Sequence, residues 1–245
     1  TELVARAAAS GVELFALTDH DTVEGLDEAA QAAADHGISL LPGLELSVYW
    51  ERRTLHIVGL GIDPANEAIT AVLEKNQQLR RDRSIRMAQK LEKAGLENAL
   101  ARAEAMAGGQ VTRSHFARLL VEAGMVVDAG QAFKRYLKPG KPGYVSAEWV
   151  SMDEGVAAIH AAGGRAILAH PFGYGFTASW RRKTLAAFKE VGGDAIEICC
   201  GNSTSADIQQ GTTDAVRYGF AGSVGADFHG PHQPWLQIGR VADLP

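Results

Sequence analysis

Cysteine and long hydrophobic runs are scarce in this chain of 245 residues. Its two cysteines, Cys199 and Cys200, are adjacent, so a structural disulfide between them is not expected and a reducing cytoplasm fits best. No apolar run approaches the roughly 18 residues of a membrane span, and no signal peptide is visible. These absences argue against a membrane protein and a disulfide-stapled secreted domain. Internal repeats are also lacking, and no obligate protein partner is evident.

Charge is present in both signs but is unevenly placed. The net charge is -5, yet the segment from Lys75 to Lys141 holds fourteen Lys and Arg against six Asp and Glu. The rest of the chain is acidic. A basic segment suits phosphate groups, whereas carboxylates in an acidic body suit cations.

The order of apolar and polar residues predicts an α/β protein with a helical insertion. Strand and helix patterns alternate over residues 1–64, disappear over the helical and basic residues 65–143, and resume over 144–245. Capping boxes at 21–24 and 151–154 each predict the start of a helix. This alternation favours a parallel barrel with a helical cap over one end.

Six short apolar runs, each typical of a buried strand, lead into or carry a residue that can bind a metal ion. Active sites of barrel and doubly wound folds collect at such strand ends. The candidate residues are His20, Glu45, His56, His170, Glu197, and the pair Asp227 and His229.

These candidates differ in how specific they are. Asp19, His20 and Asp21 crowd three ionisable groups into one turn, which is costly unless a cation or a partner neutralises them. Asp227 and His229 share one face of an extended chain, whereas His56 alone is equally consistent with a core histidine. Mixed imidazole and carboxylate ligands favour Mn, Fe or Zn over Ca, and two or more divalent ions are expected.

The motifs resemble those of the polymerase-and-histidinol-phosphatase (PHP) family of metal-dependent phosphoesterases. They occur in order along nearly the whole chain: Leu17-Thr18-Asp19-His20-Asp21, Pro42-Gly43-Leu44-Glu45-Leu46-Ser47, Leu55-His56-Ile57-Val58-Gly59, Ala169-His170-Pro171 and Gly225-Ala226-Asp227-Phe228-His229. The resemblance implies a distorted (β/α)7 TIM-like barrel with two to three divalent ions, most often Mn²⁺, with Fe²⁺ or Zn²⁺ as alternatives. It also implies that a first strand carrying a His-x-His motif precedes Thr1.

The resemblance further implies a role for each matching residue. Glu45 would bridge two ions and Asp227 would complete the shell of the first. The second ion would be held by His56 and His170, and the third by His20 and His229.

Within the family, the basic insertion is most similar to a bacterial branch that hydrolyses nucleoside 3′,5′-bisphosphates and trims 5′-phosphorylated RNA. The expected reaction is hydrolysis of the 3′-phosphate by a hydroxide bridging two ions, with His20, Asp21 or His229 passing protons. The candidate substrate contacts are Ser47, Arg80, Arg113, His115, Lys138 and Lys141. For the arginines on the long helix, a solvated surface is an equally good interpretation.

Other functions remain open at this point. Short 5′-phosphorylated RNA and histidinol-type phosphate monoesters are alternative substrates, and amide or lactone hydrolysis on a related metal barrel is a further one. From another class, the chain could be a nucleic-acid-binding module without catalysis. The aromatic segment 172–176 could close over a nucleoside or be an ordinary loop, and His36, His160 and His232 are interpreted as structural or surface residues.

Overall fold

The computed structural model describes residues 1–107, 110–230 and 236–245. The chain divides into two compact units: a sheet unit made of Thr1–Leu73 with Val150–Pro245, and a helical unit made of Glu74–Trp149. His232 lies outside the described residues. All the candidate metal ligands belong to the sheet unit. The candidate substrate contacts belong to the helical unit, apart from Ser47, which lies in the sheet unit.

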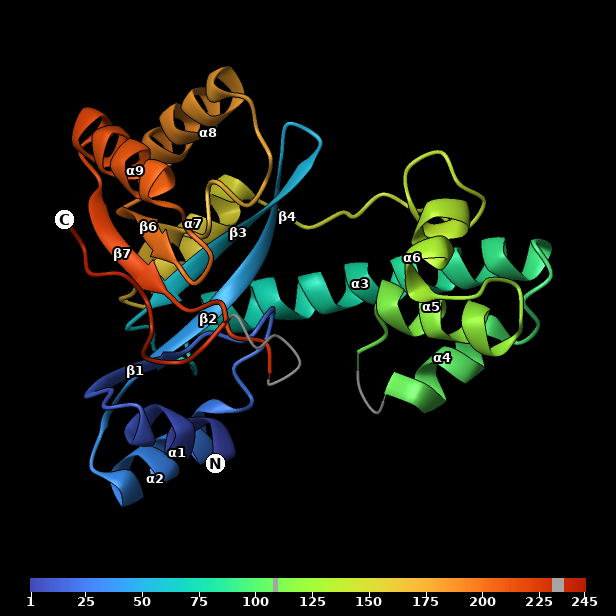
Figure 1. Cartoon of the computed structure of the whole chain (residues 1–245), viewed down its shortest axis with the longest axis horizontal. Coiled ribbons are helices and arrows are strands. Elements are labelled where there is room, and N and C mark those ends of the chain that lie inside the picture. The colour runs from blue at the N-terminus through green and yellow to red at the C-terminus, as the bar shows by residue number, and fades with distance from the viewer. Residues whose placement is uncertain (108–109, 231–235) are drawn as a thin grey trace. The chain divides into compact units, whose positions relative to one another are not determined.

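The sheet unit is built on a curled, seven-stranded sheet (Figure 1). The strands follow the order β1-β2-β3-β5-β6-β7, and the short β4 pairs with β2. Their bounds are β1 Leu14–Leu17, β2 Ser39–Trp50, β3 Arg53–Leu60, β4 Val150–Ser151, β5 Arg165–Leu168, β6 Ala195–Cys200 and β7 Ala221–Gly225. The strands β1 and β7 form the two edges of the sheet, and no pairing joins them among the described residues.

The sheet is mixed, so the prediction of a wholly parallel arrangement is wrong. β3 runs antiparallel to both β2 and β5, whereas the other pairs are parallel. A two-residue turn reverses the chain between β2 and β3, and both of its residues, Glu51 and Arg52, have positive φ values of 47° and 63°. Such a turn matches the twist of a hairpin but normally uses Gly or Asn, so Glu51 and Arg52 did not indicate it.

Successive side chains of the β2–β3 hairpin point alternately to the hydrophobic core and to the opposite face of the sheet, where the candidate ligands lie. Leu44, Leu46 and Val48 on β2 are fully buried in the main hydrophobic core, together with Leu55 and Ile57 on β3. The alternate residues on β2, Glu45 and Ser47, face the other way with His56 of β3 opposite Ser47. At Gly43 an added Cβ would lie 2.9 Å from the carbonyl oxygen of Gly59, so only glycine lets the strands approach this closely.

Helices complete the sheet unit: α1 Glu2–Ala9, α2 Leu26–His36, α7 Met152–Ala161, α8 Ala178–Glu190 and α9 Ser205–Tyr218. The predicted cap at Ser151 is confirmed, because its hydroxyl accepts the N–H of Glu154 at the start of α7. The cap predicted at Asp21 is wrong. α2 begins later, after Gly25, and the Asp21 carboxylate bonds elsewhere.

The helical unit has its own hydrophobic core, formed by residues such as Leu91, Phe116 and Leu120. Its helices are α3 Glu67–Lys93, α4 Ala99–Ala107, α5 Arg113–Glu122, α6 Ala129–Ala132 and the π-helical turn η1 Phe133–Leu137, with α3 starting in the sheet unit. Over the residues that the structure describes, no helix has the length and hydropathy needed to cross a membrane.

Candidate metal centre

The centre is assembled around Glu45, in the middle of β2. The loop after β1 continues to pair with this strand: the Glu45 N–H donates to the Asp19 carbonyl, and the Asp21 N–H donates to the Glu45 carbonyl, both at 3.0 Å. This bridge places His20 directly beside Glu45, with His20 Nε2 3.6 Å from Glu45 Oε2. The extension of strand pairing beyond Leu17 therefore positions the first imidazole.

Two further histidines approach the other oxygen of the same carboxylate. His56 Nδ1, from β3, and His170 Nε2, from the loop after β5, each lie 3.1 Å from Glu45 Oε1. These two ring nitrogens are 3.3 Å apart. Donors on a tetrahedral ion with bonds of roughly 2.0–2.1 Å lie about 3.3 Å from one another. The spacing of these side chains thus fits a divalent metal ion of the imidazole-binding class.

Because the Glu45 carboxylate is buried, its negative charge must be balanced by neighbouring groups. The Glu45 side chain is only 8% exposed. Burial would raise the pKa of Glu45, but the hydrogen bonds from His170 and His56 outweigh it and hold the pKa well below its ordinary range. Burial also opposes charge on His170, yet the hydrogen bond and charge of Glu45 raise the pKa of this histidine above its ordinary value. Glu45 is an ionised carboxylate that attracts cations.

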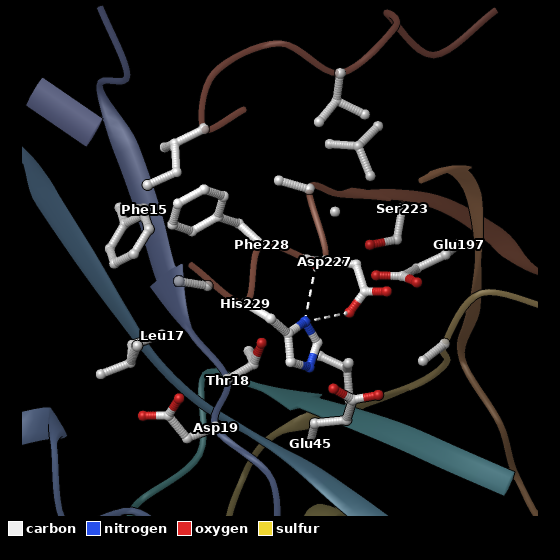
Figure 2. Close-up of a pocket in the computed structure, with 18 of the residues that line it drawn as sticks. Phe15, Leu17, Thr18, Asp19, Glu45, Glu197, Ser223, Asp227, Phe228 and His229 are labelled. Atoms are coloured by element: carbon white, nitrogen blue, oxygen red, sulfur yellow. Dashed lines mark hydrogen bonds and ion pairs between the residues drawn. The ribbon is translucent and has the colours of Figure 1, made fainter. Parts of the chain in front are cut away.

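Asp227 and His229 lie on the opposite wall, in the loop after β7. Figure 2 shows their side chains turned toward one another and toward Glu45, below the rings of Phe15 and Phe228. His229 Nδ1 is 3.4 Å from Asp227 Oδ1 and 2.9 Å from the Asp227 backbone carbonyl oxygen. His229 also approaches His20, with 5.8 Å between the ring centroids. The six candidate ligands therefore gather in one place.

Glu197, at the end of a buried apolar run, supports His170 through the backbone. Its Oε2 accepts the His170 N–H at 2.6 Å and the Cys200 thiol at 3.4 Å. His170 has an unusual φ of +31°, and this hydrogen bond stabilises that conformation. Gly225 leaves the room that Glu197 needs, because an added Cβ there would collide with Glu197 Oε1. Burial raises the pKa of Glu197 above its ordinary value.

Asp21 and Ser47, both predicted to serve the reaction directly, are instead bonded to each other in the interior. Asp21 is fully buried, and its two oxygens accept the Ser47 N–H and the Ser47 hydroxyl, each at 2.8 Å. Ser47 is itself only 2% exposed. In this structure the pair fixes the loop that carries His20 to the strand that carries Glu45.

Tyr174 is a part of the site that sequence reasoning did not assign. Its hydroxyl accepts the His56 N–H at 2.9 Å, and its ring lies 5.1 Å from that of His170. Burial raises the pKa of Tyr174, which keeps the phenol neutral. Its place in the aromatic segment 172–176 was the only signal, because the contact spans 118 residues.

A cavity of about 630 Å³ opens beside the centre, between the two edge strands. Apolar side chains of β1 and β7, including Phe15, Leu17 and Val224, line one part of it. The charged part is formed by Glu45, Glu197 and Asp227 with the site histidines. Two edge strands that run parallel to their neighbours thus flank an open slot that leads to the centre.

In the helical unit, arginines crowd around Arg83. Burial, together with the nearby charges of Arg113, Arg80 and Arg86, lowers the pKa of Arg83 to about 10. Arg83 Nε donates to the carbonyl of Val145, and the Arg80 guanidinium lies over the Trp149 ring at 4.6 Å. Neighbouring guanidinium groups repel one another, and an anion relieves this repulsion, as Glu148 does for Arg86 at 3.4 Å. Arg83 is one of the arginines on the long helix that the sequence already offered as phosphate contacts.

The remaining basic candidates are placed differently. His115 closes a capping box at the start of α5, where its Nδ1 accepts the Thr112 N–H at 3.0 Å. Lys138 and Lys141 are exposed in the turn after η1. Neither lysine is among the groups whose charges shift the pKa of Arg83.

The comparisons with known proteins agree with this geometry. The family model of the PHP domain matches residues 1–141, more than half of the chain. The chain belongs to the PHP family. The resemblance drawn from its motifs is therefore confirmed.

Three PHP-like proteins cover nearly the whole chain. A protein of Haemophilus influenzae named 5′-3′ exoribonuclease is 47% identical over the full chain and 89% of its own length. A 3′,5′-nucleoside bisphosphate phosphatase of Chromobacterium violaceum is 42% identical over 87% of its length. The solved structure of an amidohydrolase from Chromobacterium violaceum, with bound sulfate, matches 99% of this chain and 85% of its own with a TM-score of 0.87.

Proposed function

We propose that this PHP protein hydrolyses the 3′-phosphate of nucleoside 3′,5′-bisphosphates at a centre of two to three divalent metal ions. The observation that carries the proposal is the convergence of three imidazoles on the single buried carboxylate of Glu45. The protein is a hydrolase of phosphate esters, as its PHP domain and its relatives named phosphatase and exoribonuclease agree.

In this proposal the ions are held by the residues that the centre brings together. The residues that would hold them are Glu45, His20, His56, His170, Asp227 and His229. Bound divalent ions activate water as a nucleophile and stabilise charge on the phosphoryl oxygens. Nitrogen and carboxylate donors support Mn²⁺, Fe²⁺ or Zn²⁺, with Mn²⁺ as our first choice.

The chain's own residues orient the ester and move protons. His20 and His229 are the half-exposed imidazoles of the centre, and they are the groups that can pass a proton to the leaving oxygen at the open side. Asp21 and Ser47 contribute by fixing the His20 loop, since their polar atoms bond to each other. Glu197 holds the backbone of His170.

A second phosphate would be recognised by the helical unit. The charges of Arg80, Arg86 and Arg113 around Arg83 support this assignment, because a phosphate with two negative charges relieves their repulsion. Lys138, Lys141 and His115 remain candidates for weaker contacts. A substrate with two phosphates uses both a metal centre and a separate cationic group, whereas an amide or lactone needs no such group.

We also propose that a further strand closes the sheet between β1 and β7 into the distorted (β/α)7 barrel, with residues 65–143 as a helical insertion. The apolar slot between the two unpaired edges supports this, since exposed strand edges of a sheet normally pair or are covered. Leu14 on β1 is 63% exposed and Val224 on β7 is 47% exposed. A strand lying between them would cover both side chains.

A second candidate activity is 5′-3′ cleavage of short 5′-phosphorylated RNA, which the name of the Haemophilus influenzae relative supports. Both activities break a phosphate ester on the 3′ side of a nucleotide that carries a 5′-phosphate. They differ only in the group beyond that ester, so one centre can serve both.

The experiment incubates the full-length protein and Mn²⁺ with adenosine 3′,5′-bisphosphate, histidinol phosphate or a 5′-phosphorylated oligoribonucleotide. It measures inorganic phosphate from the first two and 5′-mononucleotide from the third. We expect the bisphosphate to be the best source of phosphate. His170→Ala should lower kcat by at least about a hundredfold and reduce bound metal, as loss of a ligand does. His36→Ala, an exposed histidine at the end of α2, is the matched control. Full turnover by His170→Ala would refute the site, and no turnover of any ester by the wild type would leave a binding module.

A further inference from the structure

A continuous row of aromatic rings leads from the metal centre to the tip of the β2–β3 hairpin. The His170 ring contacts Tyr174 at 5.1 Å, and Tyr174 stacks on Phe176 with the same spacing between centroids. Phe176 contacts Trp180 at 6.4 Å, and Trp180 contacts Trp50 at 6.2 Å. Each contact joins the next ring, so the row has no gap.

This row stands on the part of the sheet unit that extends beyond the centre. Trp50 is five residues past Glu45 on β2, which at ~3.3 Å per strand residue places the hairpin tip roughly 16 Å further along. The loop after β5 and the start of α8 lie next to this tip (Figure 1). The rings therefore extend from the metal centre toward the tip of the β2–β3 hairpin.

Two exposed cations lie directly over these rings. The Arg53 guanidinium is 4.5 Å from the Trp180 ring centroid and 5.1 Å from that of Phe176. Lys183 Nζ lies 5.1 Å from the Trp180 centroid and 5.5 Å from that of Trp50, and it pairs with Glu51 at 3.0 Å. Aromatic faces interleaved with cations are the surface that a single nucleic-acid strand requires.

The support beneath the row is rigid. Arg181, on α8, pairs with the buried Asp214 of α9 at 2.9 Å, and its guanidinium covers the Phe172 ring at 4.8 Å. The other end of the row is fixed by the hydrogen bond from the His56 N–H to Tyr174. A preorganised platform loses little conformational entropy when a ligand binds.

We propose that this aromatic rim, made of Trp50, Arg53, Phe176, Trp180 and Lys183, binds the single-stranded RNA that continues on the 3′ side of the cleaved phosphate. The proposal rests on the proposed function, because it extends the substrate of that centre from one nucleotide to a strand. The two cations would bind phosphates and the rings would stack on bases. Base stacking on an aromatic ring is stronger than an exposed cation–π contact, so a base can replace Arg53 on Trp180 and leave the guanidinium for phosphate.

A single strand fits this surface better than a duplex or a peptide. Bases of a duplex are stacked on each other and cannot reach protein rings, whereas splayed bases can. The alternation of ring and cation also favours a ligand that alternates flat apolar groups with negative charges. The rim would bind with little sequence preference, because every base offers a π-face.

The test is equilibrium binding without catalysis. Fluorescence anisotropy in EDTA compares 3′-labelled, 5′-phosphorylated single-stranded RNA as a dinucleotide and as an octanucleotide. The wild type should bind the octanucleotide more tightly. Arg53→Ala and Trp180→Ala should each raise the Kd of the octanucleotide about tenfold and change that of the dinucleotide less than about twofold. Arg53→Ala should also reduce the slope of log Kd against log salt by about 0.7.

Arg182→Ala is the matched control, because it removes the same charge from an exposed position next to Lys183. Equal octanucleotide binding by the wild type, Arg53→Ala and Trp180→Ala would overturn the rim, as would equal binding of a duplex of the same length. If circular dichroism shows that Trp180→Ala is unfolded, the exposed Arg53→Ala decides alone.

Phosphate release from a nucleoside bisphosphate, measured separately with Mn²⁺, distinguishes the two proposals. If phosphate is released but the rim substitutions leave octanucleotide binding unchanged, the rim proposal is refuted and the proposed reaction stands. If no phosphate is released but the rim substitutions weaken octanucleotide binding, the proposed reaction is refuted and the rim proposal stands.

Discussion

The carboxylate of Asp21 joins the loop after β1 to β2 inside the protein. With φ at +52°, Asp21 adopts a left-handed conformation that its two hydrogen bonds to Ser47 stabilise. The same residue lies next to His20, so its bonds determine where the His20 ring can point. Through these bonds Asp21 holds the loop that carries His20 against β2.

Asp21→Ala should lower the free energy of unfolding by about 3 kcal/mol, because it leaves a buried N–H and a buried hydroxyl of Ser47 without their acceptor. Urea denaturation measures the change. Asp19→Ala, an exposed carboxylate in the same loop, should change stability by less than about 0.5 kcal/mol. A folded Asp21→Ala protein with wild-type stability and no turnover would instead assign Asp21 to the chemistry.

The residues of the centre differ in how far the sequence could reveal them. His20, Glu45, His56, His170, Asp227 and His229 could be proposed because each lies in or after an apolar run. The meeting of strand ends at one edge of a sheet explains why His20, His170, Asp227 and His229 gather, whereas Glu45 and His56 lie within β2 and β3. The bond of Glu197 to the His170 backbone and that of Tyr174 to His56 could not be predicted, since they depend on loop conformations rather than on patterns.

Among the elements, α7, β5 and β6 meet at Asp194, on the residue before β6. Its carboxylate accepts the Ala166 N–H at 2.8 Å, His160 Nε2 lies 2.8 Å away, and Arg165 donates at 3.0 Å. Partial burial would raise the pKa of Asp194, but these hydrogen bonds outweigh it and lower the pKa below its ordinary value. One carboxylate thus connects three elements, and His160 has the structural role expected of it.

Asp194→Asn should destabilise the protein at neutral pH and lose this effect in acid. A lowered pKa in the folded state means that ionised Asp194 contributes stability above its unfolded pKa of about 3.9 and loses it as the pH falls through the folded value. The wild type and the variant should therefore differ in urea denaturation at pH 7 and converge as the pH falls below about 3.9 and through the folded pKa. Glu190→Gln, an exposed carboxylate at the end of α8, should show no such convergence. If the difference in unfolding free energy between wild type and Asp194→Asn stayed constant with pH, the charge of Asp194 would contribute nothing to stability.

The elements themselves were largely predictable, but not their directions. Six of the seven strands coincide with apolar runs, and the long helix α3 coincides with the loss of strand signals after residue 65. The short β4 has only Val150 and Ser151 and escaped notice. The reversal at β3 was missed because Glu51 and Arg52 form its turn without a glycine or asparagine.

For the whole molecule, metal binding should act as a stabilising ligand. An ion that binds only the folded chain adds about 2.7 kcal/mol at a concentration of 100 Kd. In a protein of this size that corresponds to a rise in Tm of about 5–10 °C. Differential scanning calorimetry with Mn²⁺ and with EDTA measures the shift, and His56→Ala should reduce it strongly. An unchanged Tm at millimolar Mn²⁺ would contradict the metal centre.

The antiparallel course of β3 also determines how much chain must be ordered before the metal donors meet. Glu45 and His56 are eleven residues apart on one hairpin, whereas His170 is 125 residues from Glu45. Closing the longer loop costs about 2 kcal/mol more chain entropy. During folding, the hairpin can therefore present one carboxylate and one imidazole as a local pair, long before the distant histidine arrives. An ion captured by that early pair would guide the later strands to their places.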